Sequence, residues 1–340
     1  MDILLTAPPG IEEISAAEIK RKLNIAPLIR PFSLKGYIML NSLSEKRTKD
    51  LFSLRSIHNI FIFIQCKKFH SIDLKKIYQM VKKVDLSEYV EEKKTFRVTS
   101  KRIGTHPFTS IDIQRIAGKA IQENTNLKVD LKNFDIEFEV DVIENSCWIG
   151  VKLTKQALSK RAYKIAHHPA ELNAAIAYAM VSQISIGRRF LDPMTGSGTI
   201  PIERFFFVKE NNEEEEIIGA DKSKKYINIA EKNAVSAKAK VSFFQLPINK
   251  VSLLGKFDAI AVDPPYGRRY KMKNLKTLYR DLIKHSFNAL DENGVIVIIT
   301  LQISLTKSLL KQFGFTITKT YRVEHGGLFP AIFYACKNFK

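Results

Sequence analysis

The stretch FLDPMTGSGTIPIE, residues 190–203, decides the fold. It reads as the end of a buried strand, an acidic residue (Asp192), a loop with two glycines, and the start of a helix. Gly196 and Gly198 remove side chains where a backbone must approach a ligand closely. No Gly-Lys-Ser/Thr follows, and Pro201 stands where the dinucleotide fingerprint has its third glycine. We therefore expect an open α/β sheet that binds its ligand at the carboxyl end of this strand, without a phosphate-binding Walker loop.

The next predicted strand also ends in an aspartate. Residues 217–221 read IIGAD, and Asp221 follows Asp192 by about one β-α unit. An acidic residue at this place typically binds the ribose hydroxyls of a nucleotide-like ligand. It can also cap the helix predicted over 222–234, and the two interpretations are compatible. The acidic run 213–216 before this strand is predicted to be a solvated loop.

A third strand end carries the chemistry. The apolar run 257–262 is followed by DPPYG at 263–267. The Asp263 carboxylate can accept a hydrogen bond from an exocyclic amine, Pro264 leaves its carbonyl free while its ring fixes φ, and Tyr266 offers a flat face for a base. Together they suit methylation of an amino group on a planar ring. The alternative is a strand ended by a proline turn, with Tyr266 as ordinary packing.

The charge favours a polyanionic partner. The formal net charge is +19, and it is spread over the chain, with +10 on residues 1–169 and +9 on residues 170–340. A field of that size attracts nucleic acid. The alternative is the Lys/Glu-rich surface of a thermophile.

Several classes of protein are excluded by what the sequence lacks. The three cysteines are far apart without a C-x-x-C, which argues against a disulfide framework, a zinc site or an iron–sulfur cluster. His167 and His168 are adjacent but have no third ligand at suitable spacing, so we expect no metal. No apolar run is long enough to span a membrane, and MDILLTAPPG lacks a signal-peptide pattern. We expect a cytoplasmic protein.

The N-terminal half alternates helices with strands that do not form a parallel series, which indicates α+β ferredoxin-like modules. Within it, FRVTSKRIGTHPFTSIDIQRIAGKAI, around residues 95–120, resembles a THUMP domain, an RNA-binding module of RNA-modifying enzymes. Lys101 and Arg102 are expected to contact phosphates without reading sequence. The alternative is a solvated strand end. The positions carried over from the resemblance are Arg97, Lys101, Arg102, His106, Ser110 and Arg115.

The C-terminal half resembles a Rossmann-like S-adenosylmethionine (SAM) methyltransferase. The resemblance implies that the glycine loop holds the methionine end of SAM, Asp221 its ribose, and Asp263, Pro264 and Tyr266 the target amine. The strand 241–245 is not followed by the usual adenine-binding aspartate, so Gln245, backbone groups or apolar contacts would hold the adenine. The implied SAM-binding residues are Asp192, Thr195, Gly196, Ser197, Gly198, Thr199, Asp221 and Gln245.

The whole chain resembles the THUMP-containing RNA guanine-N2 methyltransferases, closest to the archaeal and bacterial enzymes acting at position six of tRNA. HHPAELN, GSGTIPIE, DPPYGRR and HGGLFP carry this resemblance. It implies a monomer that binds tRNA, with Arg161, Arg268 and Arg269 as further RNA contacts. The expected domains are a ferredoxin-like domain (1–55), a THUMP domain (56–155), a linker (156–169) and the methyltransferase domain (170–340).

Four alternatives stay open at this stage. The first two are guanine-N2 methylation at position ten of tRNA and in rRNA. The third is a DNA adenine-N6 methyltransferase, which also uses DPPY but does not fit the THUMP-like half. The fourth is a catalytically silent RNA-binding subunit, against which the intact Asp192, Asp221, Asp263 and Tyr266 argue.

Overall fold

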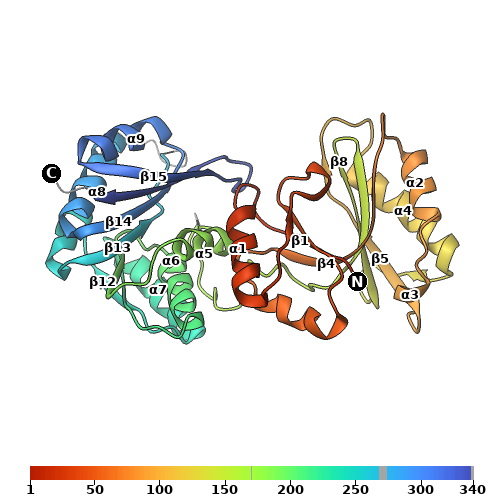
Figure 1. The fold of residues 1–340 in the computed structure, drawn as a ribbon, viewed down its shortest axis with the longest axis horizontal. Coiled ribbons are helices and arrows are strands. Elements are labelled where there is room, and N and C mark those ends of the chain that lie inside the picture. Colours follow the sequence, from red (N-terminus) through yellow and green to blue (C-terminus); the bar gives the residue numbers. More distant parts are fainter. Residues whose placement is uncertain (170, 268–273, 338–340) are drawn as a thin grey trace. The chain divides into compact units, whose positions relative to one another are not determined.

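The computed structural model describes residues 1–169, 171–267 and 274–337 (Figure 1). The chain forms two compact units. Unit 1 comprises Met1–Ala7 and Ile19–Leu158. Unit 2 comprises Pro8–Glu18 and the chain from Ser159 onward. Each unit is built around one sheet and is described by itself below.

Unit 1 contains a nine-stranded mixed sheet with the order β2-β3-β1-β4-β9-β8-β5-β7, in which β6 also pairs with β8. The long strand β4 pairs antiparallel with β1 through one edge and with β9 through the other, so the first strands of the chain and the THUMP-like strands share one sheet. The strands are β1 (Ile3–Thr6), β2 (Leu28–Ile29), β3 (Tyr37–Leu40), β4 (Asn59–Lys68), β5 (Thr95–Thr99), β6 (Arg102–Ile103), β7 (Lys128–Val129), β8 (Ile136–Ile143) and β9 (Ser146–Lys152).

Two helices in this part of the chain begin where short polar side chains cap them. Asp73 accepts a hydrogen bond from Lys76 N at 2.8 Å, and Thr109 forms a capping box with Asp112. The helical segments are α1 (Glu12–Leu23), η1 (Pro31–Ser33), η2 (Glu45–Ser53), α2 (Leu74–Lys82), α3 (Ser87–Val90) and α4 (Ser110–Thr125).

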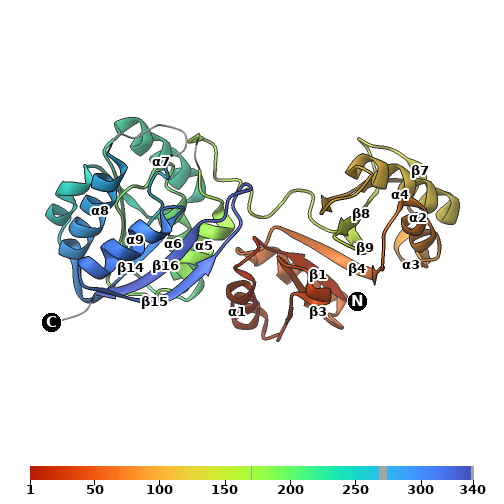
Figure 2. The ribbon, with the colours of Figure 1, turned by 90° about the horizontal axis from the view of Figure 1, so that it is seen from above.

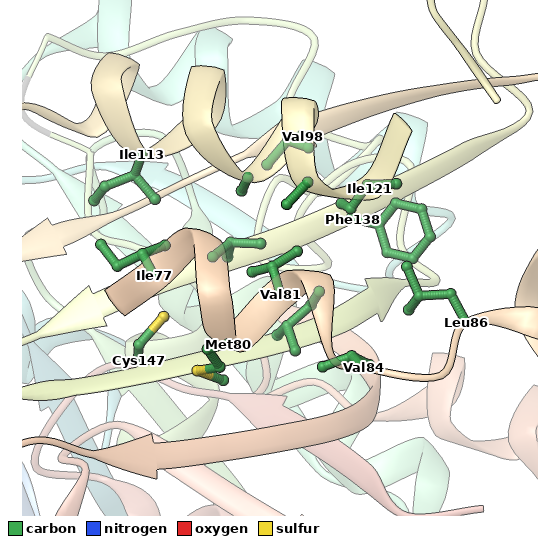
Figure 3. Close-up of a cluster of buried hydrophobic side chains, with 14 of the residues drawn as sticks. Ile77, Met80, Val81, Val84, Leu86, Val98, Ile113, Ile121, Phe138 and Cys147 are labelled. Carbon is green, nitrogen blue, oxygen red and sulfur yellow. The ribbon is translucent and has the colours of Figure 1, made fainter. Parts of the chain in front are cut away.

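The core of unit 1 lies between its sheet and the helices α2 and α4. Figure 3 shows the side chains of both helices directed toward strand residues such as Phe138. Alternate residues of a strand face opposite sides of a sheet. Phe96 and Val98 therefore enter this core, whereas Arg97 belongs to the other face.

Unit 2 contains a seven-stranded sheet with the order β12-β11-β10-β13-β14-β16-β15. The strands from β10 to β14 run parallel, and β16 is antiparallel to β14 and β15. The strand order reverses between β10 and β13, which is where open α/β sheets bind ligands. The strands are β10 (Arg189–Asp192), β11 (Glu216–Asp221), β12 (Ser242–Gln245), β13 (Phe257–Val262), β14 (Leu290–Thr300), β15 (Phe315–Arg322) and β16 (Ala331–Lys337).

Helices cover both faces of this sheet (Figure 2). Leu191 packs in a core with α8 and α9, whereas its neighbour Phe190 faces Arg204 of α6. The predicted fold class is confirmed, with a Rossmann-like domain after α+β modules. The helices are α5 (Ala174–Ser182), α6 (Thr199–Glu210), α7 (Lys224–Ala237), α8 (Leu275–Ala289) and α9 (Ile303–Gln312), with the 3-10 segment η3 (Ile248–Leu254).

The acidic run 213–216 is not a solvated loop throughout, so that prediction was wrong for its second half. Glu216 begins β11, and the side chain of Glu215 is fully buried. Arg204 donates from Nε to Glu215 Oε2 at 2.6 Å, and its Nη1 donates to the carbonyls of Val181 and Ile184. A buried carboxylate is tolerated here because a buried guanidinium neutralises it.

Candidate active site

Three aspartates meet at the carboxyl edge of the sheet in unit 2. Asp192 ends β10, Asp221 ends β11 and Asp263 follows β13, and these three strands are neighbours. The pKa of Asp192 lies well above its ordinary value, mainly because the side chain is buried and also because the charges of Asp221 and Asp263 act on it. Asp221 and Asp263 are therefore both within electrostatic reach of Asp192, and together the carboxylates favour a positively charged ligand.

The glycine loop is held against β11 by hydrogen bonds that its backbone amides donate. Thr195 N donates to Ala220 O at 2.9 Å, and Gly196 N donates to Asp221 Oδ2 at 3.2 Å. Gly196 has φ of 52°, and a Cβ at this position would meet no atom within 4 Å. The Thr195 hydroxyl is buried near the Asp192 carboxyl, but it has no hydrogen-bond partner of good geometry among the described residues. The loop thus leaves open space at Gly196 beside Asp221, and it places the Thr195 hydroxyl near Asp192.

Gly198 has a different structural role from Gly196. A Cβ on Gly198 would lie 3.1 Å from the Cβ of Ala230 in α7, so its missing side chain makes room for a helix. Ser197 and Thr199 are buried, and their hydroxyls are 3.3 Å apart. The expectation that both glycines make room for a ligand therefore describes the surroundings of Gly196, but not those of Gly198.

Gln245 lies at the same edge, because it pairs with Asp221 in the register of β11 and β12. Its side chain is exposed, and Nε2 donates to Lys222 O at 3.3 Å. The amide thus lies one strand further from Asp192 than the ribose-binding candidate does. From this position the amide can reach the base of a nucleoside whose ribose lies at Asp221.

The loop after β13 presents two buried polar atoms that lack complete hydrogen bonds. Neither Asp263 Oδ1 nor the Tyr266 hydroxyl has a partner of good geometry among the described residues. The two groups are near enough to interact: burial raises the pKa of the Asp263 carboxyl to about 7, and the neighbouring Tyr266 hydroxyl limits this increase. Unsatisfied buried polar atoms of this kind mark a place where a ligand can supply the missing partner.

Three side chains that the sequence did not single out hold this loop. Gln302 Nε2 donates to Tyr266 O at 2.9 Å, and the Tyr279 hydroxyl donates to Pro265 O at 3.4 Å. Tyr279 also lies 2.6 Å from the Thr300 hydroxyl. The apolar run 295–299 predicts a further buried strand. Its carboxyl end is followed by Thr300 and Gln302, so the sequence does contain a signal for these two residues.

The predicted RNA-binding residues differ in whether their side chains already pair within the protein. Arg97 is engaged within unit 1, since it lies 2.7 Å from Glu137 and over the ring of Phe134. Arg161 is likewise engaged within unit 2, because its nearly buried side chain lies 3.0 Å from Glu203. Arg268 and Arg269 lie outside the described residues.

The other four lie between β5 and the first half of α4. The Lys101 side chain is exposed, whereas its backbone N donates to Asp141. Arg102 Nη1 donates to Gly104 O at 2.8 Å, and the Arg115 side chain is 77% exposed. His106 Nε2 lies 2.8 Å from Glu144 O.

Two kinds of site are not found in the described part of the chain. Residues 1–169, 171–267 and 274–337 contain no group of three or more His, Cys, Asp or Glu residues suited to a metal ion. Within the same ranges no helix is both long and apolar enough to cross a lipid bilayer.

The comparisons with known proteins agree with this geometry. The RMKL-like methyltransferase domain model matches residues 161–331, and the THUMP domain model matches residues 71–152. A tRNA (guanine(6)-N2)-methyltransferase from Methanocaldococcus jannaschii is 31% identical, and the alignment covers 98% of this chain and 99% of the relative. The chain belongs to the family of THUMP-containing tRNA guanine-N2 methyltransferases. It is therefore a SAM-dependent enzyme of the methyltransferase class.

Further members of the family show similar coverage. A tRNA (guanine(6)-N2)-methyltransferase from Archaeoglobus fulgidus is 29% identical, with 96% of this chain and 90% of the relative aligned. The crystal structure of TrmN from Thermus thermophilus superimposes with a TM-score of 0.78 at 25% identity, covering 99% of both chains. The family therefore accounts for both halves of the molecule.

The residues at the sheet edge fit SAM, the cofactor of the family. SAM supplies an electrophilic methyl group on a positively charged sulfur. The carboxylates of Asp192 and Asp221 match the positive charges of such a ligand, and the space beside Gly196 admits it. The buried Thr195 hydroxyl, which has no partner of good geometry among the described residues, offers a further hydrogen bond. The fit therefore rests on charge, open space and an unused polar group.

Proposed function

We propose that this protein methylates the N2 amine of the guanosine at position six of tRNA, with SAM as the methyl donor. The observation that carries the proposal is the third carboxylate of the cluster, Asp263, whose Oδ1 is buried without a complete hydrogen bond beside the other two. The amine of a flipped guanine supplies the missing donor. The similarity to relatives named for position six supports the choice of this nucleotide.

In this proposal the SAM site is formed by the first two strand ends. Asp221 binds the ribose hydroxyls, and its existing bond to Gly196 N fixes the loop beside them. Gln245 lies where it can reach the adenine. The predicted set of SAM-binding residues is Asp192, Thr195, Gly196, Ser197, Gly198, Thr199, Asp221 and Gln245.

The catalytic step depends mainly on positioning. The guanine amine is weakly nucleophilic because its lone pair is delocalised into the ring. Hydrogen bonds from its two hydrogens to the Asp263 carboxylate and the Pro264 carbonyl favour a pyramidal nitrogen, whose lone pair then points at the methyl group. Holding the reactants in line supplies roughly 7–11 kcal/mol. Asp263 accepts the released proton, for which a pKa of about 7 is well matched.

Tyr266 is proposed to support the flipped base. Stacking on an aromatic ring contributes about 1–3 kcal/mol per base and offsets the cost of unstacking the guanine. In the structure its hydroxyl is buried near Asp263, so the ring stands beside the carboxylate that receives the amine. Catalytic roles are thus assigned to Asp263, Pro264 and Tyr266.

The THUMP region supplies RNA affinity in this proposal. Lys101, Arg102, His106 and Arg115 contact the backbone of tRNA, which positions the substrate without reading its sequence. In this proposal the protein acts as a cytoplasmic monomer. Arg97 and Arg161 contribute less than their charge suggests, because each already pairs with a buried glutamate.

Methylation of two matched tRNA transcripts tests the function. One transcript carries guanosine at position six and the other adenosine, and nuclease digestion followed by mass spectrometry locates the methyl group. We expect N2-methylguanosine at position six only, and no product with the Asp263→Ala variant. Methylation at position ten or in rRNA would replace the proposed substrate. SAM binding without product on any RNA would favour the catalytically silent subunit.

A further inference from the structure

The chain segment 161–166 is bound tightly to the methyltransferase unit. Arg161 donates from Nε to Glu203 Oε1 at 3.0 Å and from Nη2 to Oε2 at 3.3 Å. The Tyr163 hydroxyl donates to Glu203 Oε1 at 2.8 Å, and its ring packs against Ile202 and Ala234. Glu203 is fully buried in α6. Residues 161–166, called the arm here, therefore pack against α6 and α7 within unit 2.

Asn233 joins the arm to the glycine loop. This fully buried side chain of α7 accepts hydrogen bonds at Oδ1 from Ile165 N at 3.1 Å and Ala166 N at 3.0 Å. Its Nδ2 donates to Ala166 O at 2.9 Å and to Ser197 O at 3.0 Å. All four bonds link backbone groups, and they use both hydrogens and both lone pairs of the amide. The arm and the loop are thus held by one side chain.

The same loop forms the candidate SAM site on its other side. Ser197 follows Gly196, which is bound to Asp221, and precedes Gly198, which packs on Ala230 one turn before Asn233. A displacement of the Ser197 carbonyl would therefore be transmitted to the neighbouring Gly196 amide. Conversely, a ligand that fixes Gly196 and Asp221 restrains Ser197, and through Asn233 it restrains the amides of Ile165 and Ala166.

We propose that Asn233 is a positioning residue that couples docking of the arm to SAM binding. This inference rests on the proposed function, because it requires the glycine loop to bind SAM. Coupling of two equilibria is reciprocal, so SAM stabilises the docked arm as much as the docked arm strengthens SAM binding. A buried asparagine that only satisfies the backbone would stabilise the fold equally with and without SAM.

Hydrogen exchange of the unaltered protein is the first test. The amides of Ile165 and Ala166 are measured with and without saturating SAM, together with a calorimetric titration of SAM. We expect SAM to slow exchange at both amides by about tenfold or more. Identical exchange rates in a protein that binds SAM would overturn the coupling. Failure to bind SAM at all would instead contradict the proposed function, so the two failures are distinguishable.

An Asn233→Asp variant tests the residue itself. The carboxylate keeps the acceptor for Ile165 N and Ala166 N, but it places an oxygen against the carbonyls of Ser197 and Ala166. We expect SAM affinity to fall about tenfold, the effect of one lost buried hydrogen bond, and the SAM-dependent protection of the arm to disappear. Asn228→Asp is the matched control on the exposed face of α7 and should leave both unchanged. Unchanged SAM affinity of Asn233→Asp would contradict the proposal. If that variant does not fold, the exchange experiment on the unaltered protein decides.

Discussion

Gly198 lies directly against Ala230, so that a Cβ on the glycine would come within 3.1 Å of the alanine Cβ. Its φ of 81° also lies in the left-handed region. Gly196, two residues earlier, has φ of 52° but faces open space. The two glycines of one loop thus serve two purposes, of which one is packing and the other is access for a ligand.

Alanine at these two positions should separate stability from SAM binding. Gly198→Ala is expected to lower the free energy of unfolding by about 1–3 kcal/mol, because it adds backbone strain and overpacks α7. Gly196→Ala adds only the strain of the left-handed backbone, about 1 kcal/mol, but it fills space beside Asp221 and should weaken SAM binding more. Urea denaturation and calorimetry measure the two effects. If the two variants lost the same SAM affinity and the same unfolding free energy, the assignment of packing to Gly198 and ligand access to Gly196 would be wrong.

The rate of methyl transfer should depend on the ionisation of Asp263. Because burial raises the pKa of its carboxyl to about 7, the proton-accepting form is lost as the pH falls below that value. We expect kcat/KM for tRNA to fall about tenfold per pH unit below pH 7, since this parameter reports the free enzyme. A profile that stays flat down to pH 5 would exclude Asp263 as the titrating group.

The same pKa predicts a change in stability of the Asp263→Asn variant. A carboxyl whose pKa is higher in the folded than in the unfolded protein contributes stability below about pH 4, and this contribution is lost as the pH rises to about 7. The asparagine variant should therefore exceed the unaltered protein in unfolding free energy by an amount that grows over this range. The gain is at most about 4 kcal/mol. Urea denaturation at pH 4, 6 and 8 measures it, and a gain independent of pH would contradict the assignment.

Gln302 should affect catalysis without affecting SAM binding. Its side chain holds the Tyr266 carbonyl at 2.9 Å, so Gln302→Ala releases the loop that carries Asp263 and Pro264. Small displacements of reacting groups have large effects on rate, and we expect kcat to fall about 10- to 100-fold. Single-turnover methylation and calorimetry measure the two quantities. The exposed Gln312→Ala is the control, and a loss of SAM affinity in Gln302→Ala would place the residue in the cofactor site instead.

The buried ion pair of Arg204 and Glu215 should matter for stability alone. Both side chains are fully buried, so Glu215→Ala leaves a guanidinium without its counter-charge. Removing one partner of a buried pair typically costs about 3–5 kcal/mol. Glu214→Ala removes a neighbouring exposed carboxylate and should change the unfolding free energy by less than about 0.5 kcal/mol. Chemical denaturation compares the two variants, and similar effects would mean that the pair contributes little.

The double variant Lys101→Ala, Arg102→Ala should reduce the salt dependence of tRNA binding. Each phosphate contact releases counterions, so losing up to two contacts lowers the slope of log K against log[salt] by about one to two. Lys75→Ala, at another exposed lysine of unit 1, serves as the control for total charge. Filter binding from low to moderate salt gives the slopes. If both variants lower the slope of log K against log[salt] equally for each charge removed, tRNA is attracted by the charge of the whole surface and not by Lys101 and Arg102 in particular.

The features that were predictable from the sequence are local ones. A buried apolar run followed by an aspartate or a glycine identifies the ends of β10, β11 and β13, because strand and turn are encoded by neighbouring residues. Candidate residues at all three strand ends were therefore within reach of sequence reasoning.

The features that escaped prediction depend on contacts between distant residues. Glu215 reads as part of an acidic loop, and only the approach of Arg204 makes it a buried residue. Tyr279 and Gln302 look like ordinary helix and turn residues until folding places them at the loop after β13. The roles of such residues come from tertiary contacts that no local pattern records.

Unit 2 is discontinuous, and this has a consequence for how the chain folds during synthesis. Residues 8–18 belong to it, and Pro9 O accepts a hydrogen bond from Glu324 N. At about 5–20 residues per second, the ribosome produces Glu324 on the order of 15 to 60 seconds after Pro9. This N-terminal segment must therefore wait for its partner until translation is almost complete, and in a nascent chain that stalls earlier residues 8–18 have no Glu324 to bind.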